Sequence, residues 1–265
     1  MTRIKSIAEL KPIIDKIQWQ RFLDGKMEFY RGHSLRNYEL KAGLTRYEFT
    51  ESDYVQKEKD IYKNFVELYE GKDDYIRLPF TSENDSFELC NKWYSLFQAQ
   101  HIGLKTRFMD WSIGWETALM FAVENENQFG HDGSFWVFRV PDEFEYNDQE
   151  LKGVTLTTDP FDISKNMMIN TPTYMFNDKF DYVGEIRMGR QAGRFWIQSM
   201  EDSMIPMDKQ DILKPHIFEI IIDGDSKESI KAELTARGIT LDWHYYRTDE
   251  TVDDEIKVIN KNNLS

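Results

Sequence analysis

Residues 98–121 join a dense group of polar side chains to a strongly apolar run, and this contrast constrains the fold more than any other stretch. Within the twelve positions 101–112 stand His101, Thr106, Arg107, Asp110, Trp111 and Ser112, each of which is a hydrogen-bonding, titratable or aromatic residue. Residues 117–122 then read Thr-Ala-Leu-Met-Phe-Ala, a run that contains good helix formers. A polar loop ahead of a buried helix can arrange side chains and helix N-terminal amides around a small anionic ligand.

A purely structural interpretation explains the same residues. Asp110 or Ser112 would act as the N-cap of the following helix, and Arg107 would pair with Asp110. The spacing alone leaves the ligand loop and the helix cap open as alternatives.

Three short motifs connect the chain to a known family. Residues 100–112 read Gln-His-x-Gly-Leu-x-Thr-Arg-x-x-Asp-Trp-Ser, and Ala-Leu-x-Phe-Ala follows at 118–122. This pattern resembles the signature of the FRG domain family, which is named after a Phe/Tyr-Arg-Gly motif that stands here at 30–32, followed by Leu40 and Arg46. A third block, Arg-x-x-x-Gln-x-Gly-x-Phe at 187–195, resembles a later element of the family. The blocks occur in family order and cover roughly residues 25–240.

The order of these elements is also similar to that of ADP-ribosyltransferases, which have an Arg-Gly strand end, a Thr/Ser-rich segment before a helix, and a late Glu or Gln. The sequence departs from that pattern at two points. It has no Ser-Thr-Ser triplet, and Gln191 is followed by Ala192 and Gly193 instead of an x-Glu pair. A shared fold does not by itself carry shared chemistry.

The resemblance implies a pocket for NAD or a related nucleotide. Its catalytic candidates are Arg31, Arg107, Asp110 and Gln191. Its cofactor-binding candidates are Tyr30, Gly32, His33, His101, Thr106, Trp111 and Ser112. The two arginines would hold a pyrophosphate, and an aromatic ring would stack on the base. Asp110 would orient Arg107 or stabilise positive charge on the ribose, while Gln191 would hydrogen-bond a ribose hydroxyl.

Two functions from different classes remain open. The first is an ADP-ribosyltransferase-like enzyme or NAD glycohydrolase, an effector of bacterial or phage origin that acts on NAD or on a macromolecular target. The second is a non-catalytic FRG module that binds a ligand or a protein. The missing late glutamate favours the module, and the density of polar groups at 101–112 favours the enzyme.

The charge of the chain limits its partners. A net charge of −14 over 265 residues disfavours general binding to a nucleic-acid backbone, although Arg31, Arg36, Arg46 and Arg107 could supply a local basic groove. A single cysteine fits a reducing cytosol, and the five histidines lack metal-ligand spacing. No signal peptide and no run of about 18 apolar residues is present. We therefore expect a cytoplasmic protein without a membrane span or a metal, in an oligomeric state that the sequence leaves open.

The periodicity predicts an α+β single domain with a central, mostly antiparallel sheet flanked by helices. Helices are expected at 5–23 (with Ser6 as N-cap and a break near Pro12), 51–70, 87–100, from 117, and at 225–237. Strands are expected at 26–32, 133–141, 194–198, 216–222 and 239–246, with an irregular stretch at 141–182. We divide the chain into an N-terminal helix at 1–24, the FRG domain at 25–247 and a loose C-terminal tail at 248–265.

Overall fold

A computed structural model describes residues 1–49, 51–69, 85–144, 159–163, 166–170, 191, 193–244 and 250–264. These residues belong to two compact units, and each is described by itself. The first unit comprises Met1–Leu40, Asp110–Glu145 and Pro206–His244, and the second comprises Lys41–Met109, Tyr146–Ile205 and Tyr245–Ser265.

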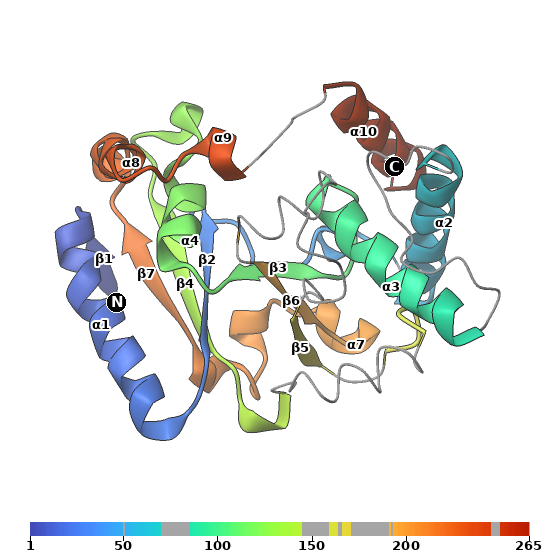
Figure 1. The fold of residues 1–265 in the computed structure, drawn as a ribbon, viewed down its shortest axis with the longest axis horizontal. Helices are drawn as coiled ribbons and strands as arrows, with labels where there is room; N and C mark the ends of the chain where they lie inside the picture. Colours follow the sequence, from blue (N-terminus) through green and yellow to red (C-terminus); the bar gives the residue numbers. More distant parts are fainter. Residues whose placement is uncertain are drawn as a thin grey trace. The chain divides into compact units, whose positions relative to one another are not determined.

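The first unit is built on a sheet whose strands lie in the order β1-β7-β4-β2-β3 (Figure 1). The strands are β1 (Thr2–Ile4), β2 (Glu28–His33), β3 (Met109–Ser112), β4 (Gly133–Arg139) and β7 (Ile217–Ile222). Only β1 pairs in parallel, with β7, and the other described pairs in this unit are antiparallel. The predicted α+β class with a mostly antiparallel sheet is confirmed.

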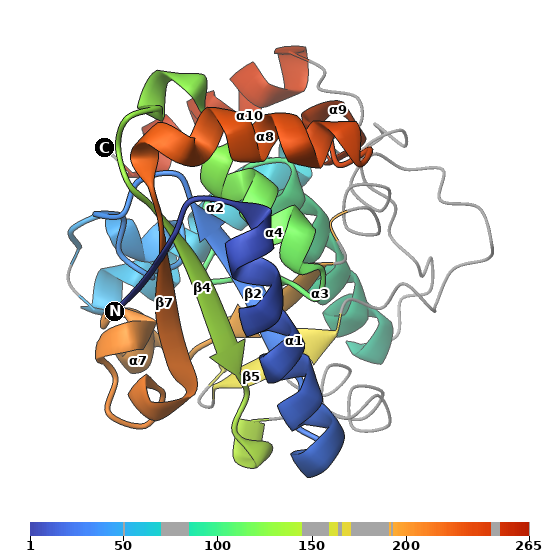
Figure 2. The same ribbon diagram turned by 90° about the vertical axis from the view of Figure 1, so that its left-hand side faces the viewer.

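Helices cover one face of this sheet. They are α1 (Ile7–Asp24), α4 (Trp115–Val123) and α8 (Lys227–Ala236); Figure 2 shows α1 and α4 in front of the sheet and α8 above the ends of β7 and β4. Phe135 and Val137 of β4 enter the core beneath these helices together with Ile220 of β7. Because side chains alternate along a strand, Ser134 and Trp136 lie on the opposite face.

Two local predictions for α1 can be judged directly. Ser6 is the N-cap, and its side chain accepts a hydrogen bond from the Glu9 amide, as predicted. The predicted break at Pro12 is wrong, because the helix runs through it to Asp24 and ends at Gly25 in the left-handed conformation. Ile7, Leu10, Ile14 and Ile17 of the same helix are buried, and this core contact holds the segment together.

The second unit packs helices around an aromatic core. Its elements are α2 (Glu51–Tyr69), α3 (Asp85–His101), the antiparallel pair β5 (Met167–Asn170) and β6 (Gly193–Ile197), α7 (Met200–Ser203) and α10 (Glu250–Leu264). Phe97 of α3 stacks on Phe195 of β6 with ring centroids 4.8 Å apart. Helix α10 lies along α2 (Figure 1), with Ile256 and Ile259 in one cluster with Ile61.

Further differences from the predicted elements concern short or late segments. The expected strand at 239–246 is instead helix α9 (Leu241–His244), and the expected loose tail contains α10. Strands β1 and β3 were not predicted, and β5 lies inside the stretch expected to be irregular. The described residues also contain short 3₁₀ helices: η1 (Leu44–Arg46), η2 (Glu126–Gln128), η3 (Asp142–Phe144), η4 (Met207–Lys209), η5 (Lys214–His216) and η6 (Gly224–Ser226). No helix among the described residues is long and apolar enough to span a membrane.

Candidate functional site

Arg31 lies near the end of β2, on the sheet face opposite α4. Its Nε donates to His33 Nε2 at 3.1 Å, and its Nη1 donates to the backbone carbonyl of Asp110. The two side chains meet because residues two apart on a strand share a face. Because a guanidinium group can only donate, His33 Nε2 is the acceptor in this contact.

Aromatic rings surround the Arg31–His33 pair. The His33 ring lies edge-on to Tyr38 and to Trp136, with centroid distances of 6.2 and 6.4 Å. Trp136 is also the register partner of Arg31 in the β2–β4 ladder. We call Arg31, His33, Tyr38 and Trp136 the Arg31 cluster.

The two residues that flank Arg31 in the sequence have structural positions. Tyr30 is fully buried in the helix-covered core, where burial, followed by the nearby Glu28 carboxylate, raises the pKa of its hydroxyl above the usual range. At Gly32, an added Cβ would lie 2.0 Å from the Ala118 carbonyl oxygen and 2.6 Å from the Ala122 amide nitrogen. Glycine at position 32 therefore lets α4 pack directly on β2, a structural role that differs from the cofactor-binding role predicted for it.

Arg107 is a buried structural cation. Its side chain is 1% exposed, and its Nε donates to Glu58 Oε2 at 2.6 Å, while its backbone amide donates to Glu58 Oε1 at 3.0 Å. Its Nη2 donates to the Pro160 carbonyl at 2.9 Å, and its Nη1 donates to the Gln198 carbonyl at 3.4 Å. The predicted pair between Arg107 and Asp110 is wrong, because Glu58 of α2 is the carboxylate that neutralises this guanidinium.

The other residues of the signature loop also have partners inside the protein. Thr106 Oγ1 donates to Gln100 Oε1 at 2.5 Å and accepts from the Phe108 amide at 3.1 Å. Trp111 is buried against Phe138, with ring centroids 5.3 Å apart. These contacts tie the loop to the core.

The predicted helix cap is wrong. The N-cap of α4 is Gly114, without a side-chain cap, so neither Asp110 nor Ser112 occupies that position. Ser112 Oγ accepts from the Gly114 amide at 3.0 Å and so supports the turn ahead of the helix. Asp110 is half-buried, and its backbone carbonyl receives Arg31.

The remaining predicted site residues lie in the second unit. His101 ends α3, but its side chain is outside the described residues, as is Arg187. Gln191 is half-buried shortly before β6. The structure thus brings Arg31, His33 and Asp110 together in the first unit, whereas Arg107 and Gln191 belong to the second. A single site shared by all of them stays a prediction.

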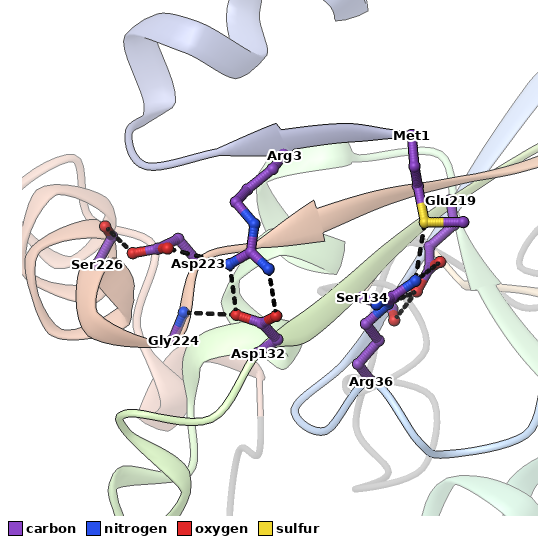
Figure 3. Close-up of polar contacts among 9 residues, drawn as sticks. All are labelled: Met1, Arg3, Arg36, Asp132, Ser134, Glu219, Asp223, Gly224 and Ser226. Atoms are coloured by element: carbon purple, nitrogen blue, oxygen red, sulfur yellow. Dashed lines mark hydrogen bonds and ion pairs between the residues drawn. The ribbon is translucent and has the colours of Figure 1, made fainter.

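A pocket of about 480 Å³ in the first unit was missed by the sequence analysis. It lies beside the Arg31 cluster and shares Tyr38 and Trp136 with it; the other lining residues are Met1, Arg36, Asn37, Glu39, Leu40, Pro206, Asp208, Lys209 and Glu219. Arg36 was noted in the sequence as a candidate for a basic groove, but its Nε donates to Glu219 Oε1 at 3.2 Å (Figure 3). We call this cavity the Arg36–Glu219 pocket.

Next to this pocket, an ionic network fixes the N-terminal strand. Arg3 of β1 donates to both carboxylate oxygens of Asp132, at 2.7 and 2.6 Å, and to Asp223 at 3.1 Å (Figure 3). The Gly224 amide also donates to Asp132, at 3.2 Å. The hydrogen bonds from Arg3 lower the pKa of Asp132 below its usual value. The network joins the ends of three strands, and among the described residues no group of three or more His, Cys, Asp or Glu side chains is arranged to hold a metal ion.

Comparison with known families agrees with two of the three motifs. Residues 26–131 match the family model of the FRG domain, and this range contains both the Tyr-Arg-Gly motif and the signature loop. No curated protein and no solved structure was found to match the chain. Residues 26–131 of this chain are therefore an FRG domain.

Proposed function

We propose that this FRG domain belongs to a non-catalytic module that binds a small ligand. The observation that carries the proposal is the environment of Arg107. A pyrophosphate needs the guanidinium donors that Glu58, Pro160 and Gln198 already occupy. Opening this buried ion pair would leave a carboxylate without its partner, which is strongly unfavourable.

Other motif residues support the same proposal. Gly32 is closed off by α4, and Tyr30 and Trp111 are core residues, so none of the three offers a free surface to a nucleotide. Gln191 is a neutral amide and cannot act as a general base. The Arg36–Glu219 pocket has a volume in the range of small-molecule sites.

The second candidate is an NAD-using enzyme, either ADP-ribosyltransferase-like or an NAD glycohydrolase. One observation favours it: Arg31 is half-buried at a strand end beside His33, surrounded by aromatic rings. Under this alternative Arg31 binds the pyrophosphate of NAD. A lysine would not replace its two parallel donors.

Calorimetric titration with NAD, followed by an assay for nicotinamide release, separates the two candidates. The full chain is compared with Arg31→Lys and with Arg237→Lys, a control at the exposed C-cap of α8. The module predicts no nicotinamide release by any of the three proteins. Release by the parent and by Arg237→Lys, but not by Arg31→Lys, would overturn the proposal in favour of the enzyme.

A further inference from the structure

We propose that the Arg36–Glu219 pocket binds a free aromatic amino acid in its zwitterionic form. The inference rests on the proposed function, because it names the ligand class of the binding module. Four features of the pocket carry it: its apolar and aromatic surface, its paired charges, one buried donor and its acidic rim.

The surface of the pocket suits a planar apolar group. Leu40 and Trp136 are buried residues that line it, and Tyr38 adds a more exposed ring. Aromatic side chains favour offset or edge-on contact with another ring. The pocket therefore offers a place for an aromatic side chain.

Charges of both signs meet at the same pocket, and they are paired. Arg36 Nε and Nη2 donate to the two oxygens of Glu219, at 3.2 and 3.4 Å, and Ser134 Oγ donates to Glu219 Oε1 at 2.5 Å (Figure 3). Lys209 contacts Asp208 at 2.7 Å. The hydrogen bond to Asp208, followed by the charges of Glu219 and Glu39, raises the pKa of Lys209.

This pairing selects a dipolar ligand. A purely anionic or cationic group that inserts between paired residues satisfies one partner and leaves the other without a counter-charge. A zwitterion places its carboxylate next to Arg36 or Lys209 and its ammonium next to Glu219. Each residue of an opened ion pair therefore gains a new partner of opposite charge. Phosphates are disfavoured further, because Glu39, Asp208 and Glu219 place three carboxylates around the cavity.

Trp136 provides an independent observation. It lines the pocket and is only 8% exposed, yet its indole Nε1 is buried without a hydrogen-bond acceptor among the described residues. Buried polar groups normally have a partner, and one that lacks a partner requires an explanation. The carboxylate of a bound amino acid would be a suitable acceptor if the indole, whose Nε1 is buried in this structure, turns toward the pocket on binding.

Four matched phenyl compounds test the ligand class by calorimetric titration of the full chain. They are L-phenylalanine (zwitterion), phenethylamine (cation), 3-phenylpropionate (anion) and N-acetylphenylalaninamide (neutral). We expect L-phenylalanine to bind with a Kd of about 1 mM or lower, and each analogue to bind about tenfold more weakly. Equal affinity for all four compounds, tighter binding of an analogue, or no binding of L-phenylalanine up to about 10 mM would overturn the proposal.

Substitutions then locate the site. Trp136→Phe keeps a ring but removes the indole donor, and Lys209→Ala removes an exposed cation of the pocket. We expect each to weaken L-phenylalanine binding by about fivefold or more. Lys214→Ala, an exposed lysine of η5 outside the pocket, is the matched control and should bind like the parent. If circular dichroism shows that Trp136→Phe does not fold, the L-phenylalanine affinities of Lys209→Ala and Lys214→Ala are compared instead. Equal affinities of these two variants would overturn the assignment of the site.

The two proposals fail in different ways. Nicotinamide release that depends on Arg31 refutes the non-catalytic module, whatever the amino acid titration shows. Absence of both nicotinamide release and L-phenylalanine binding overturns the inference about the pocket and leaves the module standing.

Discussion

Removing the negative charge of Glu58 should destabilise the protein strongly, because it leaves Arg107 buried without a counter-charge. The Arg107 side chain is 1% exposed and the Glu58 side chain 3% exposed, so water cannot replace the lost partner. Breaking one side of a buried ion pair typically costs about 3–5 kcal/mol. In Glu58→Gln one oxygen remains to accept a hydrogen bond, so we expect a loss of about 3 kcal/mol in the free energy of unfolding.

A double-mutant cycle separates the pair from its surroundings. Arg107→Met alone leaves the Glu58 carboxylate buried and should cost about as much as Glu58→Gln. The double variant Glu58→Gln/Arg107→Met removes both charges together, so we expect it to lose much less than the sum of its two single variants. Such coupling is the signature of a structural pair.

Urea unfolding followed by circular dichroism measures these changes, as shifts of the midpoint at constant slope. The control is Asp254→Asn in α10, where Lys257 and Asp254 form a pair with both side chains more than 70% exposed. Exposed pairs of this kind contribute little, so the control should stay within about 0.5 kcal/mol of the parent. The reasoning is refuted if Glu58→Gln is as stable as this control, or if the double variant loses the full sum.

Three further predictions concern the first unit. Gly32→Ala should lose about 3 kcal/mol or more of unfolding free energy in thermal unfolding, because its Cβ would overlap the Ala118 backbone. The control Gly25→Ala has open space around its Cβ but a φ of 77°, so it should lose about 1–2 kcal/mol. Equal losses in the two variants would contradict the packing argument. The pKa of Asp132 is lowered in the folded state, so its stabilisation is present above the ordinary carboxyl pKa and is lost as the pH falls through the lowered value. Asp132→Asn should therefore weaken the acid dependence of the melting temperature, and an unchanged acid profile would count against the Arg3 network. The pKa of Tyr30 is raised in the folded state, so its contribution to stability is lost as the pH rises above the ordinary tyrosine value of about 10. The stability of Tyr30→Phe should therefore depend less on pH in alkali. Denaturation profiles of the two proteins that coincide between about pH 9 and 11 would refute this.

The long elements were predictable because each combines a strong period with a clear start or stop. Ser6 begins α1 and Gly25 ends it, and the alternation along Gly133–Arg139 identifies β4. The antiparallel pairing of β4 with β2 and β7 requires that these strands meet across long sequence separations. The sequence indicated which strands exist, and their order came from the structure.

The errors cluster where a short element depends on a distant partner. Strand β3 is only four residues long, and it pairs with β2 through Ser112 and Tyr30. Because that partner is distant in the sequence, no local pattern distinguishes the strand from a loop. The C-terminal error is different. Ile256 and Ile259 are three positions apart, a helical spacing that was readable, and both are buried in the cluster that includes Ile61 of α2.

Residue types identified which positions have polar side chains. They could not show whether those side chains bind a ligand or bind other groups inside the protein. Arg107 was expected to bind a phosphate, yet its donors point to Glu58 of α2 and to two backbone carbonyls. An arginine suited to bidentate binding of an anion is equally suited to neutralising a buried carboxylate. Only the position of Glu58, 49 residues earlier in the chain, decides between the two roles.

The Arg36–Glu219 pocket shows the opposite case, a site without a motif. Its lining comes from Met1, from residues 36–40, from one residue each of β4 and β7, and from Pro206, Asp208 and Lys209, so no window of the sequence contains it. The β4–β7 register places Trp136 opposite Glu219, and the segment after β2 brings Arg36 to the same carboxylate. The order of the strands therefore determines which side chains meet at this pocket. The FRG motif helps to fix that order, because Gly32 allows α4 to pack on β2 and Arg31 donates to the Asp110 carbonyl of the neighbouring strand. Substituting motif residues should consequently disturb folding first, whereas substituting the exposed pocket residue Lys209 should disturb binding without disturbing folding.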